Sequence, residues 1–173
     1  MGTRRIDICE RFAARLRSDG AAAFAAHLDL ADPPSIDPFV KSADYLIGDV
    51  DVLISAAGLV DASWVGAQHL AAQIIPLMIE NGRGDVVLIS PELVGASTAS
   101  ADRMLQAWAA GLDAEFVGTG IRTSIVRSTG LVPPHDVACL IVAAISAQLQ
   151  VVDVIPSGRE SATSDGLTRE IRR

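Results

Sequence analysis

The sequence predicts a three-layer α/β domain, in which helices cover both faces of a reduced parallel sheet of about five strands. Short apolar runs of strand length alternate along the chain with stretches of helical periodicity. The apolar runs are nearly continuous rather than alternating, which is typical of parallel strands buried on both faces. Half of the 173 residues are hydrophobic but only 4% are aromatic, so aliphatic side chains and alanine are expected to form the core.

Five stretches have helical spacing and end at residues that terminate helices. We expect the first to stop at Gly20, the second to begin at the N-cap Ser35 and stop at Gly48, and the third to stop at Asn81-Gly82. The fourth ends before a glycine pair, and the fifth opens on two prolines. The expected helices are Glu10–Ser18, Ser35–Leu46, Ser63–Glu80, Ser100–Phe116 and Pro133–Ala147.

Five apolar runs lie between or beside these helices and are expected to be strands. The first, AAAFAAHL, is rich in alanine, whereas the later ones, such as DVLISAA and DVVLIS, are rich in Val, Leu and Ile. The expected strands are Ala21–Leu28, Asp51–Ala57, Asp85–Ser90, Ile121–Val126 and Val151–Ile155.

The length predicts one domain with a core that needs no metal or disulfide. We expect this domain to span residues 1–155. Residues 156–173 are polar, rich in Gly, Ser and Thr, and lack apolar periodicity, so they are expected to form a flexible tail.

Charge and cysteine content limit the possible partners and compartments. The net charge is −7 and the 14 basic residues form no stripe, which argues against a nucleic-acid partner. No apolar run approaches the roughly 20 residues of a membrane span, and no secretory signal is recognisable. Cys9 and Cys139 form no metal-ligand pattern with each other or with histidine. We therefore expect a soluble cytoplasmic protein without a metal site.

Several segments, in the right order, resemble one enzyme family. These are LRSDGAAAFAAHLDLAD, GDVDVLISAAG, PLMIENGRGDVVLIS and AWAAGLDAEFVGTGIRTSI, followed by the last helix and strand. They are similar to segments of the short-chain dehydrogenase/reductases (SDRs), a Rossmann-fold family that uses NAD(H) or NADP(H). The resemblance covers most of the chain from about Leu16 onward and implies a truncated, degenerate member that lacks the N-terminal strands.

The family's catalytic Asn-Ser-Tyr-Lys tetrad falls on residues of different chemistry. Alignment places Ser63 at the asparagine, Pro91 at the serine, Thr98 at the tyrosine and Asp102 at the lysine. A threonine hydroxyl is a far weaker acid than a tyrosine phenol, whose pKa is about 10. Aspartate reverses the charge that, in the family, lowers the tyrosine pKa. We therefore expect no catalytic residues of the family type.

The glycine-rich cofactor loop is also unrecognisable, because MGTRRIDIC contains a single glycine. In an alternative alignment, Asp7-Ile8-Cys9 is the remnant of that loop. Either way the phosphate cradle at a helix N-terminus is absent from the sequence, so we expect no nicotinamide cofactor.

Loss of the first two family strands predicts a rearranged sheet. The family's first strand lies at the centre, where the strand order reverses. We expect Ala21–Leu28 to close against Val52–Ile54, which gives the sheet order 1-2-3-4-5 without a ligand crevice.

The resemblance also implies a subunit interface. The family pairs subunits through the two helices that correspond to Ser63–Glu80 and Ser100–Phe116. Tryptophan is enriched at such contacts, and the interface candidates are Trp64, His69, Ile75, Met104 and Trp108.

The favoured function is a catalytically inactive structural or regulatory subunit, either as a homodimer or beside an intact SDR. The alternative is a small enzyme with nicotinamide-independent chemistry in a remodelled cavity. A small-ligand sensor is a third, weaker possibility.

Overall fold

The computed structural model describes residues 1–56, 62–90, 96–128, 133–148 and 151–154. The main sheet has four parallel strands in the order β3 (Val52–Ser55), β4 (Gly84–Ser90), β5 (Ile121–Ser128) and β6 (Val151–Val154). A second, two-stranded parallel sheet pairs β1 (Gly2–Thr3) with β2 (Ala26–His27). The α/β class predicted from the sequence is confirmed.

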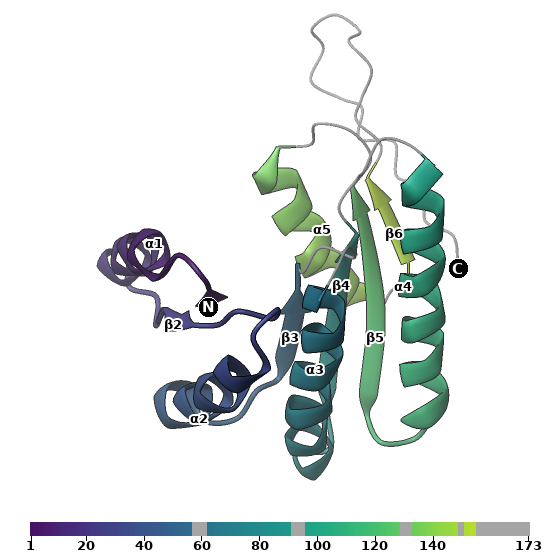
Figure 1. Cartoon of the computed structure of the whole chain (residues 1–173), viewed down its shortest axis with the longest axis horizontal. Coiled ribbons are helices and arrows are strands. Elements are labelled where there is room, and N and C mark those ends of the chain that lie inside the picture. Colours follow the sequence, from purple (N-terminus) through teal and green to yellow (C-terminus); the bar gives the residue numbers. More distant parts are fainter. Residues whose placement is uncertain (57–61, 91–95, 129–132, 149–150, 155–173) are drawn as a thin grey trace, which may run out of the picture.

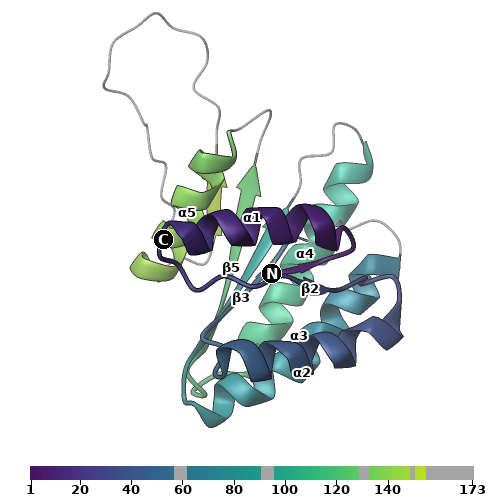
Figure 2. The ribbon, with the colours of Figure 1, turned by 90° about the vertical axis from the view of Figure 1, so that its left-hand side faces the viewer.

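Helices cover both faces of the main sheet (Figure 1). On one face lie α3 (Ala62–Glu80) and α4 (Ala96–Glu115), and on the other lies α5 (Pro134–Ala147). The N-terminal part contributes α1 (Ile6–Ser18) and α2 (Ile36–Ile47), which run across one edge of the sheet (Figure 2). Elements alternate in type along the chain, as the sequence predicts.

The larger core cluster lies between the main sheet and the α3–α4 layer. Its fully buried centre includes Ile75 and Met78 of α3, Val86 and Leu88 of β4, and Ile36 at the start of α2. On the other face a smaller cluster joins Val87 and Val126 of the sheet to α5. Successive residues of a strand point to opposite faces, so adjacent β4 residues such as Val86 and Val87 enter different clusters.

The expected pairing of Ala21–Leu28 with Val52–Ile54 is wrong. Only residues 26–27 of the first apolar run are a strand, and the N–H groups of Ala26 and Leu28 donate to the carbonyl oxygens of Met1 (3.0 Å) and Thr3 (3.1 Å). Alanine is a weak strand former, which explains the shortness of this strand. In the described part of the chain β3 is therefore the terminal strand of the main sheet. A single sheet with the order 1-2-3-4-5 does not form.

Two further boundaries differ from the sequence prediction. The first helix begins at Ile6 rather than Glu10, directly after the short strand β1. Ser35 lies at the end of a 3-10 turn, and its side chain makes no capping hydrogen bond to α2. The expected tail, residues 156–173, lies outside the described residues.

Candidate functional site

A cavity of about 380 Å³ lies between the two sheets, at the carboxyl ends of β1 and β3. Its polar lining comes from Thr3 at the end of β1, Arg4 after it, Asp29 after β2, Ser55 at the end of β3 and Ser63 at the start of α3. The apolar lining includes Leu28, Leu30, Phe39, Leu53, Ile54 and Leu70. Ligands of open α/β sheets bind outside the carboxyl ends of the strands, so this cavity is the candidate functional site.

The turn after β2 shapes one wall of this cavity. Asp29 accepts the N–H of Ala31 on its carboxylate (3.0 Å), and Ser35 bonds to the Asp29 backbone. The Ser35 hydroxyl accepts the Asp29 N–H (2.9 Å) and donates to the Asp29 carbonyl (2.8 Å). The Asp29 carboxylate therefore stabilises the turn beside the cavity.

A close approach of α3 fixes the same wall from the other side. A Cβ atom at Gly66 would lie 1.9 Å from the carbonyl oxygen of Leu30. Only glycine allows the helix to touch this backbone so closely. The contact joins the N-terminal part of the chain to the helix that packs on the main sheet.

Of the residues at the four tetrad positions, the structure describes the side chains of two, Ser63 and Asp102. Ser63 lines the cavity, whereas Asp102 lies on α4 and accepts hydrogen bonds from Arg127 Nε (2.8 Å) and Gln106 Nε2 (2.6 Å). Pro91 and the side chain of Thr98 lie outside the described residues.

Arg127 is a functional candidate that the sequence assigns only as a strand-flanking residue, solvated or paired. It follows the apolar part of β5, and its guanidinium and the Asp102 carboxylate form an ion pair in which both side chains are about one quarter exposed. An arginine directly after the predicted strand Ile121–Val126, in a chain with an aspartate at the family's lysine position, is the signal that could have identified it.

The five interface candidates have different positions. His69 is exposed on α3 and Met104 is 43% exposed on α4. Trp64 and Trp108 are half-buried and contact each other edge to face, with ring centroids 5.0 Å apart. Ile75 is only 2% exposed and belongs to the larger core cluster. Its side chain points at the sheet, so this residue offers no surface to a partner.

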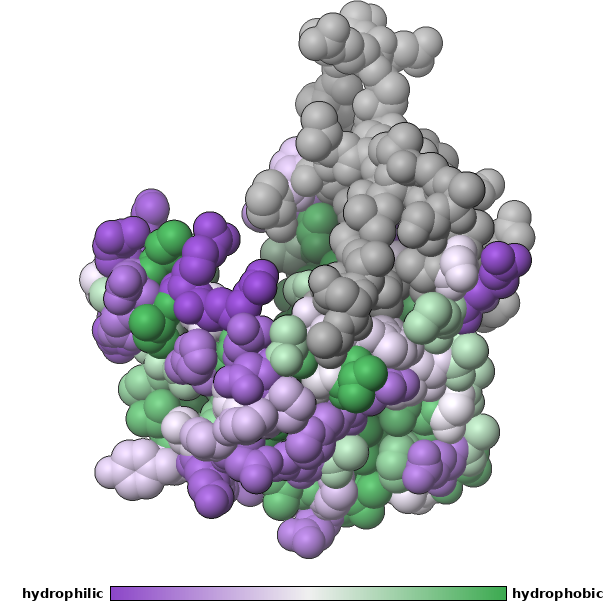
Figure 3. All heavy atoms as spheres, in the orientation of Figure 1, coloured by the Kyte–Doolittle hydropathy of each residue, from purple (hydrophilic) through white to green (hydrophobic). Residues whose placement is uncertain are grey.

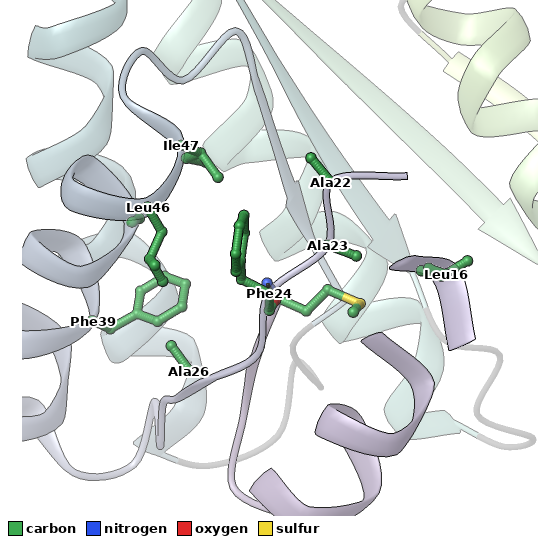
Figure 4. A pocket seen from close by; sticks show the side chains of 10 residues that line it. Leu16, Ala22, Ala23, Phe24, Ala26, Phe39, Leu46 and Ile47 are labelled. Atoms are coloured by element: carbon green, nitrogen blue, oxygen red, sulfur yellow. Dashed lines mark hydrogen bonds between the residues drawn. The ribbon is translucent and has the colours of Figure 1, made fainter. Parts of the chain in front are cut away.

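A second cavity, of about 360 Å³, is almost entirely apolar (Figure 4). It lies between α1, the segment before β2, and α2, and it is lined by alanines together with Leu16, Phe24, Phe39, Leu46 and Ile47. None of the residues that line it carries an acidic, basic or hydroxyl side chain, so these side chains offer no group for acid–base or nucleophilic chemistry.

Metal ligands and membrane spans give no further site. The described residues contain no group of three or more His, Cys, Asp or Glu side chains that could hold a metal ion. On α5 the Cys139 sulfur lies 3.6 Å from His135 Nε2, a pair of side chains one helical turn apart. Among the described helices none is both long and apolar enough to cross a membrane.

The chain is similar to several reductases and dehydrogenases. It is 27% identical to the glycine betaine reductase ATRR of Emericella nidulans over 73% of this chain and 12% of that protein. It is 24% identical to the ketoacyl reductase HetN of Nostoc sp., over 90% of this chain and 64% of that one. A third relative is the 1-deoxy-11-beta-hydroxypentalenate dehydrogenase of Streptomyces avermitilis, at 26% identity over 70% and 57% of the two chains. No family model matches the chain.

Solved structures show the same fold. A metagenomic short-chain oxidoreductase in complex with NADP superposes with a TM-score of 0.76 at 22% identity, over 90% of this chain and 84% of that one. A short-chain dehydrogenase from Streptomyces avermitilis gives a TM-score of 0.74 at 20% identity, over 90% and 78% of the two chains.

This chain is an SDR-like protein. The resemblance recognised in its sequence is confirmed by the curated relatives and by the superposed structures. The SDR-like chain spans less than two thirds of the length of each of the three curated relatives named above.

Proposed function

We propose that this SDR-like chain is a non-catalytic subunit, which pairs through α3 and α4 with a second copy or with an intact SDR. The single observation that carries the proposal is the ion pair between Asp102 and Arg127, 2.8 Å apart. The alignment places the family's catalytic lysine at position 102.

The chemistry of that ion pair is opposite to what the family's mechanism needs. A lysine ammonium near a tyrosine favours the ionised phenol and lowers its pKa. Asp102 is an anion whose charge Arg127 compensates, and the residue at the tyrosine position is Thr98. In the family's route, hydride transfer is accompanied by donation of a proton from an acidic side chain. Neither of these two positions carries a proton donor of suitable acidity.

The outward faces of α3 and α4 support the pairing part of the proposal. Val65 on α3 is 64% exposed, and Met104 on α4 is also well exposed. On α4 the next turns present Ala107 and Gly111, and no atom lies within 4 Å of a Cβ placed at Gly111. Small residues beside exposed apolar ones allow a second helix to approach closely. In Figure 3 apolar side chains gather over this part of the surface.

A second candidate is an enzyme with nicotinamide-independent chemistry in the 380 Å³ cavity. The observation that favours it is the mixed lining, which brings Arg4, Asp29, Ser55 and Ser63 around one hollow. Small-molecule sites combine an apolar wall with a few convergent polar groups in this way.

Cofactor binding tests the non-catalytic part of the proposal. Thermal unfolding would be measured with and without NADPH and NADH at millimolar concentration, beside an active SDR as positive control. A ligand present at 100 times its Kd stabilises a protein by about 2.7 kcal/mol, which shifts the melting temperature by several degrees. We expect no shift for this chain. Saturable binding at micromolar concentration, together with dehydrogenase or reductase activity, would contradict the proposal.

Light scattering tests the pairing part. We expect a dimer for the wild type, or a complex with an intact SDR on co-expression, which buries at least about 1,000 Å². Met104→Glu places a charge in the contact and should yield monomers. Val117→Glu is the matched control, because Val117 lies after α4 and is highly exposed. A wild type that is monomeric at micromolar concentration and captures no intact SDR would move the alternative enzyme to first place.

A further inference from the structure

The edge of β3 and the edge of β1 lie on opposite sides of the candidate cavity. Gly2 and Thr3 of β1 line one side, and Leu53, Ile54 and Ser55 of β3 line the other. Each of these strands has a parallel partner on its other side, β2 and β4 respectively. The cavity therefore separates two parallel sheets at a place where both have an open edge in the described part of the chain.

Backbone groups from both strands point into this space. The Asp51 carbonyl accepts the N–H of Asp85 (2.9 Å). Along a strand the backbone groups of successive residues face opposite neighbours, so the N–H and carbonyl groups of Val52 and Ile54 are directed away from β4. On β1 the carbonyl oxygens of Met1 and Thr3 bond to β2, so the backbone groups of Gly2 point away from β2. An unpaired strand edge is a template for a further strand.

The side chains along the β3 edge are apolar on both faces. Leu53 packs against the larger core cluster, and the next residue, Ile54, points to the opposite face. Ile54 is 48% exposed, whereas the residues of the neighbouring strand β4 are buried or half-buried throughout.

Helix α1 is also incompletely covered. On α1, Ile8 is 48% and Phe12 is 53% exposed, although they lie one turn apart on the same face. Figure 3 shows a hollow between the α1 region and α5. Apolar residues of the β3 edge thus border the cavity, and α1 carries further exposed apolar residues on one face.

We propose that this space is a strand-binding slot, which accepts an extended apolar segment of another polypeptide between β1 and β3, parallel to β3. The segment pairs with the backbone groups of Val52 and Ile54 on one side and of Gly2 on the other.

The slot specifies the chemistry of its occupant. β3 offers four residues, so the bound segment needs about four to six residues in extended conformation. Because the cavity wall has Leu28 and Leu70 on one face and Ile54 on the other, the segment must be apolar at consecutive positions. A charged residue fits at the carboxyl end of the segment, where Arg4 and Asp29 line the cavity. Strand addition of this kind takes its affinity from main-chain hydrogen bonds and its specificity from the side-chain pockets.

A synthetic peptide tests the slot directly. The probe is acetyl-Lys-Val-Val-Ile-Val-Thr-Lys-amide with a fluorescent label on one lysine, added to the full chain. The control peptide has the same sequence with N-methyl groups on alternate residues, which blocks strand pairing and leaves the side chains unchanged. Binding is read from fluorescence anisotropy, and its place is read from hydrogen exchange at the amides of Val52 and Ile54.

We expect saturable micromolar binding of the probe and at least tenfold weaker binding of the N-methylated peptide. With the probe bound, the amides of Val52 and Ile54 should exchange at least tenfold more slowly than in the free protein. Ile54→Lys should weaken binding of the probe at least tenfold. Val117→Lys, which also replaces an exposed aliphatic residue with lysine but lies outside the slot, should leave the binding unchanged.

Four results would overturn the proposal. The first is the absence of probe binding at 1 mM, and the second is equal binding of both peptides. The third is exchange at Val52 and Ile54 that is slow without peptide and depends on protein concentration, since a second copy would then occupy the edge. The fourth is protection of these amides by NADPH instead of by the peptide, which would assign the cavity to a nucleotide. The proposed α3–α4 pairing is unaffected by any of the first three.

Discussion

Replacing Gly66 with alanine should loosen the contact between α3 and the turn after β2. The new Cβ would lie 1.9 Å from the Leu30 carbonyl oxygen and 2.6 Å from its carbon. These are backbone atoms, so the turn or the helix must move by about 1 Å or more before the contact is tolerable. In a helix interior alanine is favoured over glycine by about 1 kcal/mol. Overpacking typically costs about 1–3 kcal/mol and here acts on backbone atoms.

We therefore expect Gly66→Ala to lower the free energy of unfolding by about 1–2 kcal/mol. Gly111→Ala is the matched control on α4, because no atom lies within 4 Å of its added Cβ. This variant should raise the free energy of unfolding by about 0.5–1 kcal/mol, through helix propensity alone. Urea unfolding followed by the fluorescence of Trp64 and Trp108 measures both. Changes of the same sign and size in the two variants would refute the argument, because the close approach at Leu30 would then have no energetic effect.

Two further experiments test individual contacts. Ser35→Ala removes the buried hydroxyl that bonds to the N–H and the carbonyl of Asp29, and should lower the free energy of unfolding by about 1–3 kcal/mol. The control is Ser42→Ala, at an exposed hydroxyl on α2. Its free energy of unfolding, measured in the same urea assay, should stay within about 0.5 kcal/mol of the wild type. In a double-mutant cycle of Trp64→Leu and Trp108→Leu, the edge-to-face contact predicts a coupling energy of about 0.5–1.5 kcal/mol, and a value near zero would show that the two rings contribute independently.

The sequence by itself determined the order and type of the main elements. Helix ends at Gly48 and Gly82 were predictable because both residues adopt a positive φ, of 70° and 71°, which other residues rarely adopt. The apolar run DVVLIS predicted β4, since a strand buried on both faces needs apolar residues at consecutive positions. The SDR resemblance was readable for the same reason, because it depends on local segments in a fixed order.

Only the tertiary structure decided which strands pair and which side chains meet. The strand β1 has two residues, Gly2 and Thr3, and no apolar pattern, so no local sequence signal predicts it. It forms because β2 supplies the hydrogen bonds. Ser35 looked like a helix cap and instead fixes the Asp29 backbone.

The same distinction applies to the candidate site. The sequence identified Asp102 as a charge reversal, but its partner Arg127 lies on another element 25 residues away. Ile75 and Met104 lie on helices that were both predicted, yet one side chain is buried and the other exposed. Helical periodicity defines which residues share a face, whereas packing against the sheet selects the face that is buried. Pairing and packing join residues distant in the chain, and a single sequence carries no local signal of which distant residues will meet.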